Sequence, residues 1–140
     1  MQPILFKNIT GIFFSAIVFL FMTSVQAGGS PSPSSDRVKL GKQVYNRCMG
    51  CHSLERNRTG PKHCGILGRK AGSVENYDYS NALASSDIIW SRETLSEYIK
   101  APFDAVPGTT MGFSGIKDDE ERSALIDYLI VANDSSECVK

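Results

Sequence analysis

The sequence has no excess of charge of either sign, because its 15 Lys and Arg residues equal its 15 Asp and Glu residues. A chain with this balance is a poor candidate for nucleic-acid binding, which needs a basic surface. The alternation of apolar and polar residues that indicates β-strands is weak throughout, so no β-sheet is indicated. The sequence also shows no internal repeat, so a repeat architecture is not indicated. Histidine occurs only twice, at positions 52 and 63, which leaves few imidazole ligands for a metal.

The longest apolar run, residues 12–22, is shorter than the roughly 20 residues that a membrane-spanning helix needs. It follows a single basic residue, Lys7, and precedes Val25-Gln26-Ala27, an order typical of a secretory signal peptide over residues 1–27. An uncleaved membrane anchor is the alternative. Cleavage would leave Gly28 first, so no lipid-bearing cysteine is expected, and residues 28–35 are a flexible Gly/Ser/Pro linker.

Three segments of the expected domain, residues 36–134, have the apolar spacing of helices. Each follows a side chain that can accept hydrogen bonds from a helix N-terminus. The first follows Ser35 or Asp36 and runs to about Cys48; the second follows Ser91 and is ended by Pro102; the third follows Asp118, which is spaced with Glu121 as a capping box.

The segments between these helices, residues 53–81 and 103–116, contain closely spaced Gly and Pro and are expected to be loops. Loops of this length are uncommon in a small compact domain, because they bring few apolar side chains of their own to the core. They indicate that something besides the chain fills the core, which favours a large apolar cofactor.

The stretch "RCMGCHS", residues 47–53, has two cysteines three apart and a histidine directly after the second. Cys48, Cys51 and His52 are too close together in the sequence for a common zinc site. A redox dithiol usually lies next to a βαβ pattern, which is not present. A disulfide that happens to precede a histidine is a further alternative. The C-x-x-C-H spacing fits covalent haem best, because both sulfurs can add to haem vinyl groups while His52 reaches the iron.

Iron in a closed electron carrier needs a second axial ligand. His63 is eleven residues beyond His52, on the same side of the ring, and Met49 lies between the two cysteines. Met111, in the loop "VPGTTMGF", is far enough along the chain to reach the other haem face. A single Met more often fills a core, but thioether ligation raises the reduction potential of cytochromes and is the interpretation preferred here.

Five segments in the same order resemble class I c-type cytochromes, the family of mitochondrial cytochrome c and bacterial cytochrome c2. They lie between residues 36 and 132 and read "GKQVYNRCMGCH", "TGPKHCGILGRKAG", "YDYSNAL" with Trp90, "ETLSEYIKAP" and "VPGTTMGFSGIKDDEERSALIDYL". The resemblance implies an all-α cytochrome c fold. In it, three to four short helices and long loops wrap around one haem c, and the N- and C-terminal helices cross.

The resemblance also implies roles for individual residues around the haem. Cys48 and Cys51 would form the thioethers, and His52 and Met111 would be the axial ligands. Pro61 would accept a hydrogen bond from the other ring nitrogen of His52. The remaining implied contacts are Arg69, Tyr79 and Trp90 at the haem propionates, Tyr98 and Thr109 on the methionine side, and Gly41 and Tyr45 against Leu125 and Tyr128 where the helices cross.

Three departures from the family pattern stand out. The segment between His52 and Pro61 is short, which points to a bacterial variant. Leu83 stands where many relatives have an Asn near a propionate, so that polar network is altered. Phe103 and Asp104 replace a usual lysine pair beside the haem edge, and only part of the basic docking ring is kept, by Arg47, Arg58 and Lys117.

The two remaining cysteines, Cys64 and Cys138, have no counterpart in common members of the family. Export would place them in an oxidising compartment, where thiols rarely stay free. We therefore expect a disulfide that ties the tail, residues 135–140, to the haem loop. A free or intermolecular Cys138 is the alternative.

The expected function is one-electron transfer by a soluble, monomeric, periplasmic bacterial carrier that is not an enzyme. Its partners would be redox proteins, with no nucleic acid and no membrane insertion after signal cleavage. Residues 36–70 carry nine basic and two acidic residues, whereas residues 117–140 carry three and seven, an asymmetry that suits a charged docking partner. The alternatives are a small haem peroxidase or gas sensor in which Met111 is displaced, and a haem-free binding module held by disulfides.

Overall fold

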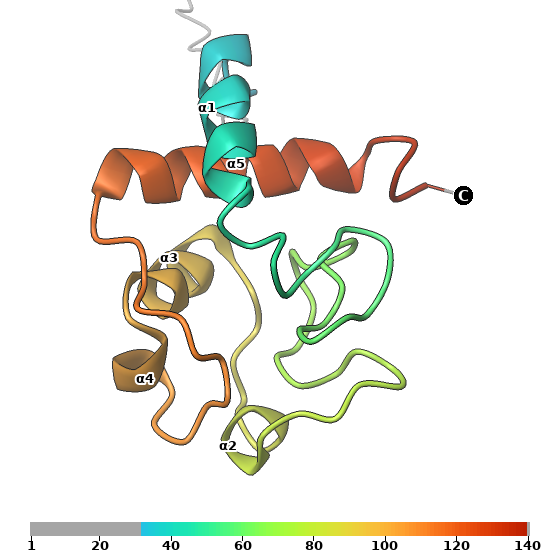
Figure 1. Ribbon diagram of the computed structural model, residues 1–140. Helices are drawn as coiled ribbons and strands as arrows, with labels where there is room; N and C mark the ends of the chain where they lie inside the picture. Colours follow the sequence, from blue (N-terminus) through green and yellow to red (C-terminus); the bar gives the residue numbers. More distant parts are fainter. Residues whose placement is uncertain (1–31, 140) are drawn as a thin grey trace, which may run out of the picture. The chain divides into compact units, whose positions relative to one another are not determined.

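The computed structural model describes residues 32–139, and its elements are helices joined by long loops (Figure 1). The helices are α1 (Ser35–Tyr45), α2 (Asn81–Ala84), α3 (Arg92–Lys100), α4 (Pro102–Ala105) and α5 (Asp119–Asn133). Within the described residues the β-structure is limited to one isolated bridge between Lys70 and Ile89. The expected all-α class is confirmed, and α2 and α4 are single turns that the sequence pattern did not predict.

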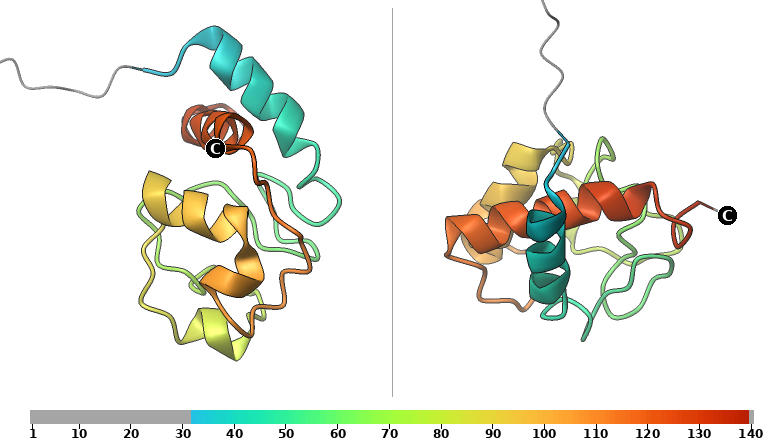
Figure 2. Two further views of the ribbon diagram at one scale, coloured as in Figure 1. Left: turned by 90° about the vertical axis from the view of Figure 1, so that its left-hand side faces the viewer. Right: turned by 90° about the horizontal axis from the view of Figure 1, so that it is seen from above.

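Helices α1 and α5 cross in close contact, as both views of Figure 2 show. Their closest approach is at Gly41, where an added Cβ atom would overlap the carbonyl oxygen of Ala124. The rings of Tyr45 and Tyr128 meet beside this point with centroids 5.1 Å apart. The predicted crossing of the terminal helices is therefore present, and glycine at position 41 is what permits its short interhelical distance.

Asp127 joins the three longest helices. Its side chain is only 5% exposed, and its two oxygens accept hydrogen bonds from Arg37 of α1 at 2.8 Å and from Arg92 of α3 at 2.5 Å. Arg37 also donates to Ser123 one turn earlier on α5. Burial raises the pKa of Asp127, but these hydrogen bonds outweigh burial and hold the pKa below its usual value.

Both ends of the first helix differ from the sequence prediction. The first cap is Ser34, whose hydroxyl accepts from Arg37, and the helix ends at Tyr45, three residues before Cys48. Ser91 and Asp118 do cap α3 and α5 as predicted. Asp118 accepts from the Glu121 amide, but the Glu121 carboxylate binds Arg47 across the helix crossing, so the capping box is only half formed.

The apolar core lies beneath α5, between α3 and the loops. It includes Leu95, Tyr98 and Ile99 from α3 and Leu125, Ile126 and Leu129 from α5. Within residues 32–139 no helix is long and apolar enough to cross a membrane. The expected signal peptide, residues 1–27, and most of the expected linker lie outside the described residues.

Candidate functional site

The two free cysteines lie in the turn that follows α1. The turn continues the helical direction for a few residues, because the amides of Cys48 and His52 donate to the carbonyls of Tyr45 and Cys48 at 2.8 and 2.9 Å. Cys48 is half-buried and Cys51 is exposed, and neither is in a disulfide. Burial raises the pKa of the Cys48 thiol to about 11. Both thiols are therefore available for covalent attachment of a group at the rim of the core.

His52 is buried, and its imidazole is held from two sides. Its Nδ1 donates to the carbonyl oxygen of Pro61 at 2.8 Å, the contact that the sequence resemblance implied. Gly60 lies so close to the ring that an added Cβ atom would overlap it. Burial lowers the pKa of His52, and the Pro61 hydrogen bond offsets this only in part. The result is a neutral imidazole whose Nε2 is unprotonated and free to bind a metal.

The second histidine, His63, packs against the first. The His52 and His63 rings are stacked, with centroids 4.3 Å apart and an interplanar angle of 21°. The His63 Nδ1 lies 3.2 Å from the Tyr45 hydroxyl. Burial and the nearby His52 and Arg69 lower the pKa of His63 to about 3, so its ring is neutral. His63 is therefore on the same side as His52, as the sequence spacing indicated, and is not placed as an opposing ligand.

Met111 stands in the loop between α4 and α5, half-buried against the core. Thr109 organises this loop, because its buried hydroxyl lies 2.7 Å from the Tyr98 hydroxyl and accepts from the Met111 amide at 3.3 Å. In Figure 1 this loop and the segment after α1 lie on opposite sides of the domain beneath α5. The segment that contains His52 and the loop that contains Met111 are therefore on opposite sides of the domain in this view.

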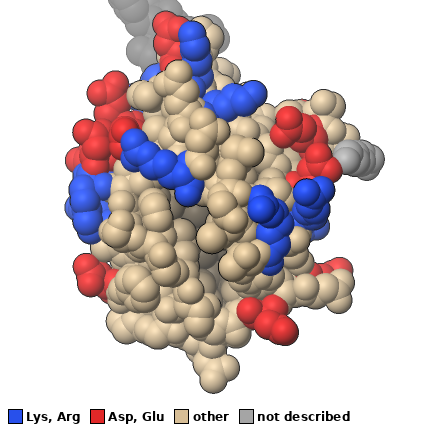
Figure 3. Space-filling view, viewed as in Figure 1, with Lys and Arg blue, Asp and Glu red and all other residues tan. Residues whose placement is uncertain are grey.

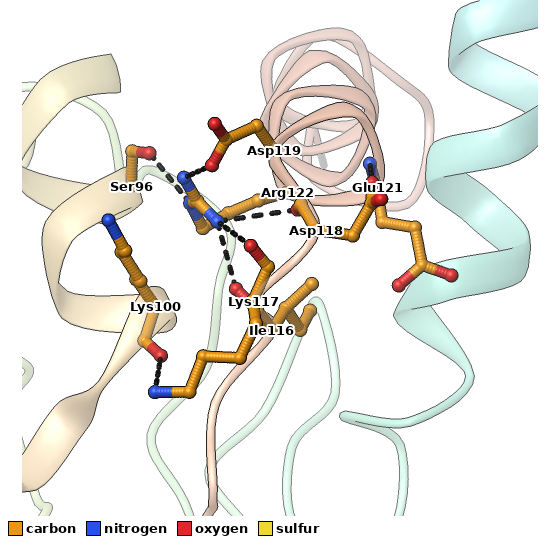
Figure 4. A network of polar contacts seen from close by, with 8 residues as sticks. All are labelled: Ser96, Lys100, Ile116, Lys117, Asp118, Asp119, Glu121 and Arg122. Carbon is orange, nitrogen blue, oxygen red and sulfur yellow. Dashed lines mark hydrogen bonds and ion pairs between the residues drawn. The ribbon is translucent and has the colours of Figure 1, made fainter.

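Arg122 holds the Met111 loop where the loop joins α5, and its side chain is 7% exposed (Figure 4). Its Nη1 donates to the carbonyls of Ile116, Lys117 and Asp118 at 2.9, 3.2 and 3.3 Å. Its other nitrogens bind Ser96 of α3 and the carboxylate of Asp119. One guanidinium therefore fixes the loop to α3 and to the start of α5.

The three residues assigned to the propionates lie near one another, with Arg69 between the other two. Arg69 donates to the carbonyls of Cys64 and Lys62 at 2.8 and 3.0 Å, and its charge acts on the Tyr79 hydroxyl. Burial nevertheless raises the pKa of Tyr79 overall. Trp90 lies beside Arg69, because its amide donates to the Arg69 carbonyl at 2.9 Å, and its buried ring packs on Tyr98 with ring centroids 5.2 Å apart.

The residues expected to form a basic ring are engaged within the molecule. Arg47 forms two 2.6 Å hydrogen bonds to Glu121, Arg58 donates to the Met49 carbonyl at 2.6 Å, and Lys117 donates to the Lys100 carbonyl at 2.8 Å. The face in Figure 3 is hollowed near its centre, and a broad area below the hollow, over α2 and α4, has few charges. Phe103 is 54% exposed at the start of α4.

The family model for cytochrome c matches residues 38–130, a segment that holds the C-x-x-C-H motif, Met111 and Arg122. The chain belongs to the cytochrome c family. Its relatives include the cytochrome c 2.1 of Caenorhabditis briggsae, 44% identical over 102 residues that cover 71% of this chain and 90% of that protein. The cytochrome c2 of Blastochloris viridis is 39% identical over 106 residues, which cover 74% of this chain and 83% of that protein.

A solved structure gives the same result for the fold. Cytochrome cH from Methylobacterium extorquens matches this cytochrome with a TM-score of 0.66 and 35% sequence identity, covering 67% of this chain and 97% of that one. The cytochrome c fold expected from the sequence is thereby confirmed. So is the cofactor, because this family carries haem c bound covalently through cysteines, and members of the family are electron carriers.

The donor groups of this cytochrome fit such a haem. Cys48 and Cys51 are unpaired, while the other two cysteines are joined to each other, with Cα atoms 5.3 Å apart. His52 presents an unprotonated Nε2, and Gly60 leaves room for its ring. The zinc site weighed from the sequence has no counterpart, since residues 32–139 contain no group of three or more His, Cys, Asp or Glu suited to a metal.

Two contributors to this site do not follow from the sequence pattern. The position of His63 suggests only a possible iron ligand, and nothing in its spacing indicates that it stacks on His52. Arg122 lies in a helix with an amphipathic pattern, in which an arginine is usually exposed to solvent. Its three carbonyl partners come from a loop without periodicity, so the sequence does not indicate these contacts.

Proposed function

We propose that this cytochrome is a one-electron carrier whose single haem c has His52 and Met111 as axial ligands. The observation that supports the proposal most directly concerns His52, the residue directly after Cys51. Its Nδ1 donates a hydrogen bond to the carbonyl oxygen of Pro61. It fixes the tautomer that exposes Nε2, and it raises the basicity of that nitrogen toward a metal. When bound, haem iron supplies the one-electron Fe(III)/Fe(II) couple.

The second ligand is proposed from the way the Met111 loop is held. Thr109 and Tyr98 fix the backbone at the methionine, and Arg122 fixes the loop where it joins α5. A loop anchored at both places keeps the thioether in one position, which favours a ligand that stays bound in both oxidation states. Such a ligand limits rearrangement during electron transfer and raises the reduction potential.

The other predicted residues are proposed to shape the surroundings of the haem. Tyr98 and Thr109 are proposed to line the methionine side, and the buried contact between the Tyr98 and Trp90 rings would exclude water and favour the reduced state. Arg69, Tyr79 and Trp90 are proposed to face the propionates. The Arg69 guanidinium already donates hydrogen bonds to two loop carbonyls, which hold it in place. Its positive charge would therefore act on the propionates from a fixed position.

We further propose that the protein is exported to a bacterial periplasm as a monomer, after removal of residues 1–27, and that it exchanges electrons with redox proteins. The Cys64–Cys138 disulfide supports export, because such a bond persists in oxidising compartments. Since Arg47, Arg58 and Lys117 are bound within the molecule, docking would rest less on a basic ring than on the sparsely charged face.

The absorption spectrum of the haem-loaded protein tests this proposal. A low-spin ferric spectrum with a thioether–iron band is expected, and Met111→Leu should abolish the band and lower the reduction potential. Met49→Leu is the matched control, because Met49 is an exposed methionine in the same chain. A five-coordinate spectrum in the unaltered protein would instead indicate a peroxidase or gas sensor, and an unchanged band in Met111→Leu would exclude that ligand.

A further inference from the structure

His63 forms a flat wall against one face of the His52 imidazole. The two rings are nearly parallel, at 21°, with centroids 4.3 Å apart, a distance at which they are in van der Waals contact. A ring lying flat on another resists rotation of its neighbour about the Cβ–Cγ bond, because rotation would drive ring atoms into it. An aliphatic side chain at position 63 would fill the space but would not present this flat surface.

Two other groups restrict the same rotation. The Gly60 backbone lies so near the His52 ring that even a methyl group there would overlap ring atoms. The Pro61 carbonyl accepts from Nδ1 at 2.8 Å and fixes the edge of the ring. Gly60 and Pro61 act through the backbone, so of these three contacts only the one with His63 depends on a side chain.

Tyr45 in turn fixes His63. Its hydroxyl lies 3.2 Å from the His63 Nδ1, and the two rings meet edge to face with centroids 5.6 Å apart. Tyr45 is 4% exposed and also packs on Tyr128 of α5. The orientation of His63 is therefore set from the crossing of α1 and α5.

We propose that His63, oriented by the Tyr45 hydroxyl, is a positioning residue that sets the plane of the His52 imidazole and, through it, the electronic asymmetry of the ferric haem. This inference rests on the proposed function only in taking His52 as an axial ligand. It concerns the angle of the ligand ring rather than whether the ligand binds, so it makes separate predictions.

The test compares single variants of the haem-loaded ferric protein at one pH. The readouts are the spread of the haem-methyl NMR shifts and the electron paramagnetic resonance g-values, both of which depend on the ligand plane. We expect His63→Leu, which removes the flat ring, to change both readouts. Tyr45→Phe, which removes only the hydroxyl, should change them in the same direction by a smaller amount.

Two further variants separate positioning from packing. His63→Phe restores a flat ring, and combined with Tyr45→Phe it leaves no buried hydroxyl without a partner, so this double variant should return the readouts from the His63→Leu values to those of Tyr45→Phe alone. Tyr128→Phe is the matched control, because it removes a neighbouring hydroxyl from the ring that packs on Tyr45, and it should leave both readouts unchanged.

The outcomes distinguish the two proposals. Unchanged methyl shifts and g-values in both His63→Leu and Tyr45→Phe, with the thioether–iron band intact, would overturn the positioning role and leave the proposed function standing. If the His63→Leu variant does not accumulate with haem, the comparison of Tyr45→Phe with Tyr128→Phe decides the question alone. Equal methyl shifts and g-values in those two variants would overturn the positioning role of His63. Absence of a low-spin spectrum in the unaltered protein would instead contradict the ligand assignment itself.

Discussion

Gly41 lies against the carbonyl group of Ala124 so closely that any side chain at position 41 would overlap it. Gly41→Ala should therefore force α1 away from α5 and loosen the contact between Tyr45 and Tyr128. Overpacking of this kind costs about 1–3 kcal/mol. We expect a loss of that size in the free energy of unfolding, measured by urea denaturation of the haem-loaded protein.

Gly50→Ala is the matched control for this substitution. An added Cβ atom at Gly50 would meet no other group within 4 Å, so the variant should have nearly wild-type stability. Equal stabilities of the two variants would show that the helices can separate without cost, which contradicts the tight crossing.

Asp127 makes stability depend on pH in a defined direction. Because the hydrogen bonds from Arg37 and Arg92 hold its pKa below the usual value, its contribution is complete above about pH 4, the unfolded pKa, and is lost as the pH falls through the folded pKa. Asp127→Asn should cost about 1–3 kcal/mol at pH 7, because the buried acceptor of two hydrogen bonds is weakened while both arginines keep access to solvent. The difference between wild type and variant should shrink below pH 4 in urea denaturation.

Asp87→Asn gives the comparison for an exposed pair. Asp87 is 97% exposed and binds Lys70 at 3.0 Å, so screening by solvent leaves little stabilisation to lose. A difference for Asp127→Asn that stays constant from pH 7 to pH 3 would mean that Asp127 acts through shape alone.

The sequence predicted those parts of the fold that depend on local signals. The caps Ser91 and Asp118, the stop at Pro102, and the crossing of the first and last helices are all present. The first helix was predicted to reach about Cys48 but ends at Tyr45, because hydrogen bonding there shifts to a tight turn. The single turn of α4 lies where the sequence predicts a loop, since four residues are too few to show a helical period.

The site was predictable where chemistry fixes spacing and not where it depends on tertiary contact. Cys48, Cys51 and His52 are adjacent in sequence because they serve one group, so the motif identified them. The stacking of His63 on His52 and the hold of Arg122 on the carbonyls before α5 depend on side-chain direction. The sequence gives no period from which such contacts follow, so they required the structure.

The link between Cys64 and Cys138 closes a sequence separation of 74 residues. In the chain-entropy model a loop of this size contributes roughly 4 kcal/mol, by restricting the unfolded chain. The Asn133 side chain also accepts from the Gly65 amide at 2.6 Å, so the last residue of α5 is bound to the same loop beside the disulfide. We expect non-reducing mass analysis to show no free thiol at either cysteine, and reductant to lower the free energy of unfolding.

The double variant Cys64→Ala with Cys138→Ser is the control for the reductant. It should have the lower stability of the reduced protein, and reductant should not change it further. If Cys138 of the native protein reacts with a thiol reagent before reduction, the disulfide assignment is wrong and an intermolecular or free cysteine takes its place.

Arg122 offers the sharpest test of how the Met111 loop is held. Arg122→Lys keeps the positive charge, but a lysine cannot reach Ser96 and three carbonyls at once. Some of these buried acceptors therefore lose their hydrogen-bond donor. Each such acceptor that water does not reach costs about 1–3 kcal/mol of stability. We expect lower stability and, because the loop is freed where it meets α5, loss of the thioether–iron band at a lower pH or urea concentration than global unfolding. Arg56→Lys, on an exposed loop, should change neither midpoint. If the band and the global fold are lost together in Arg122→Lys, the arginine stabilises the domain as a whole rather than the methionine loop.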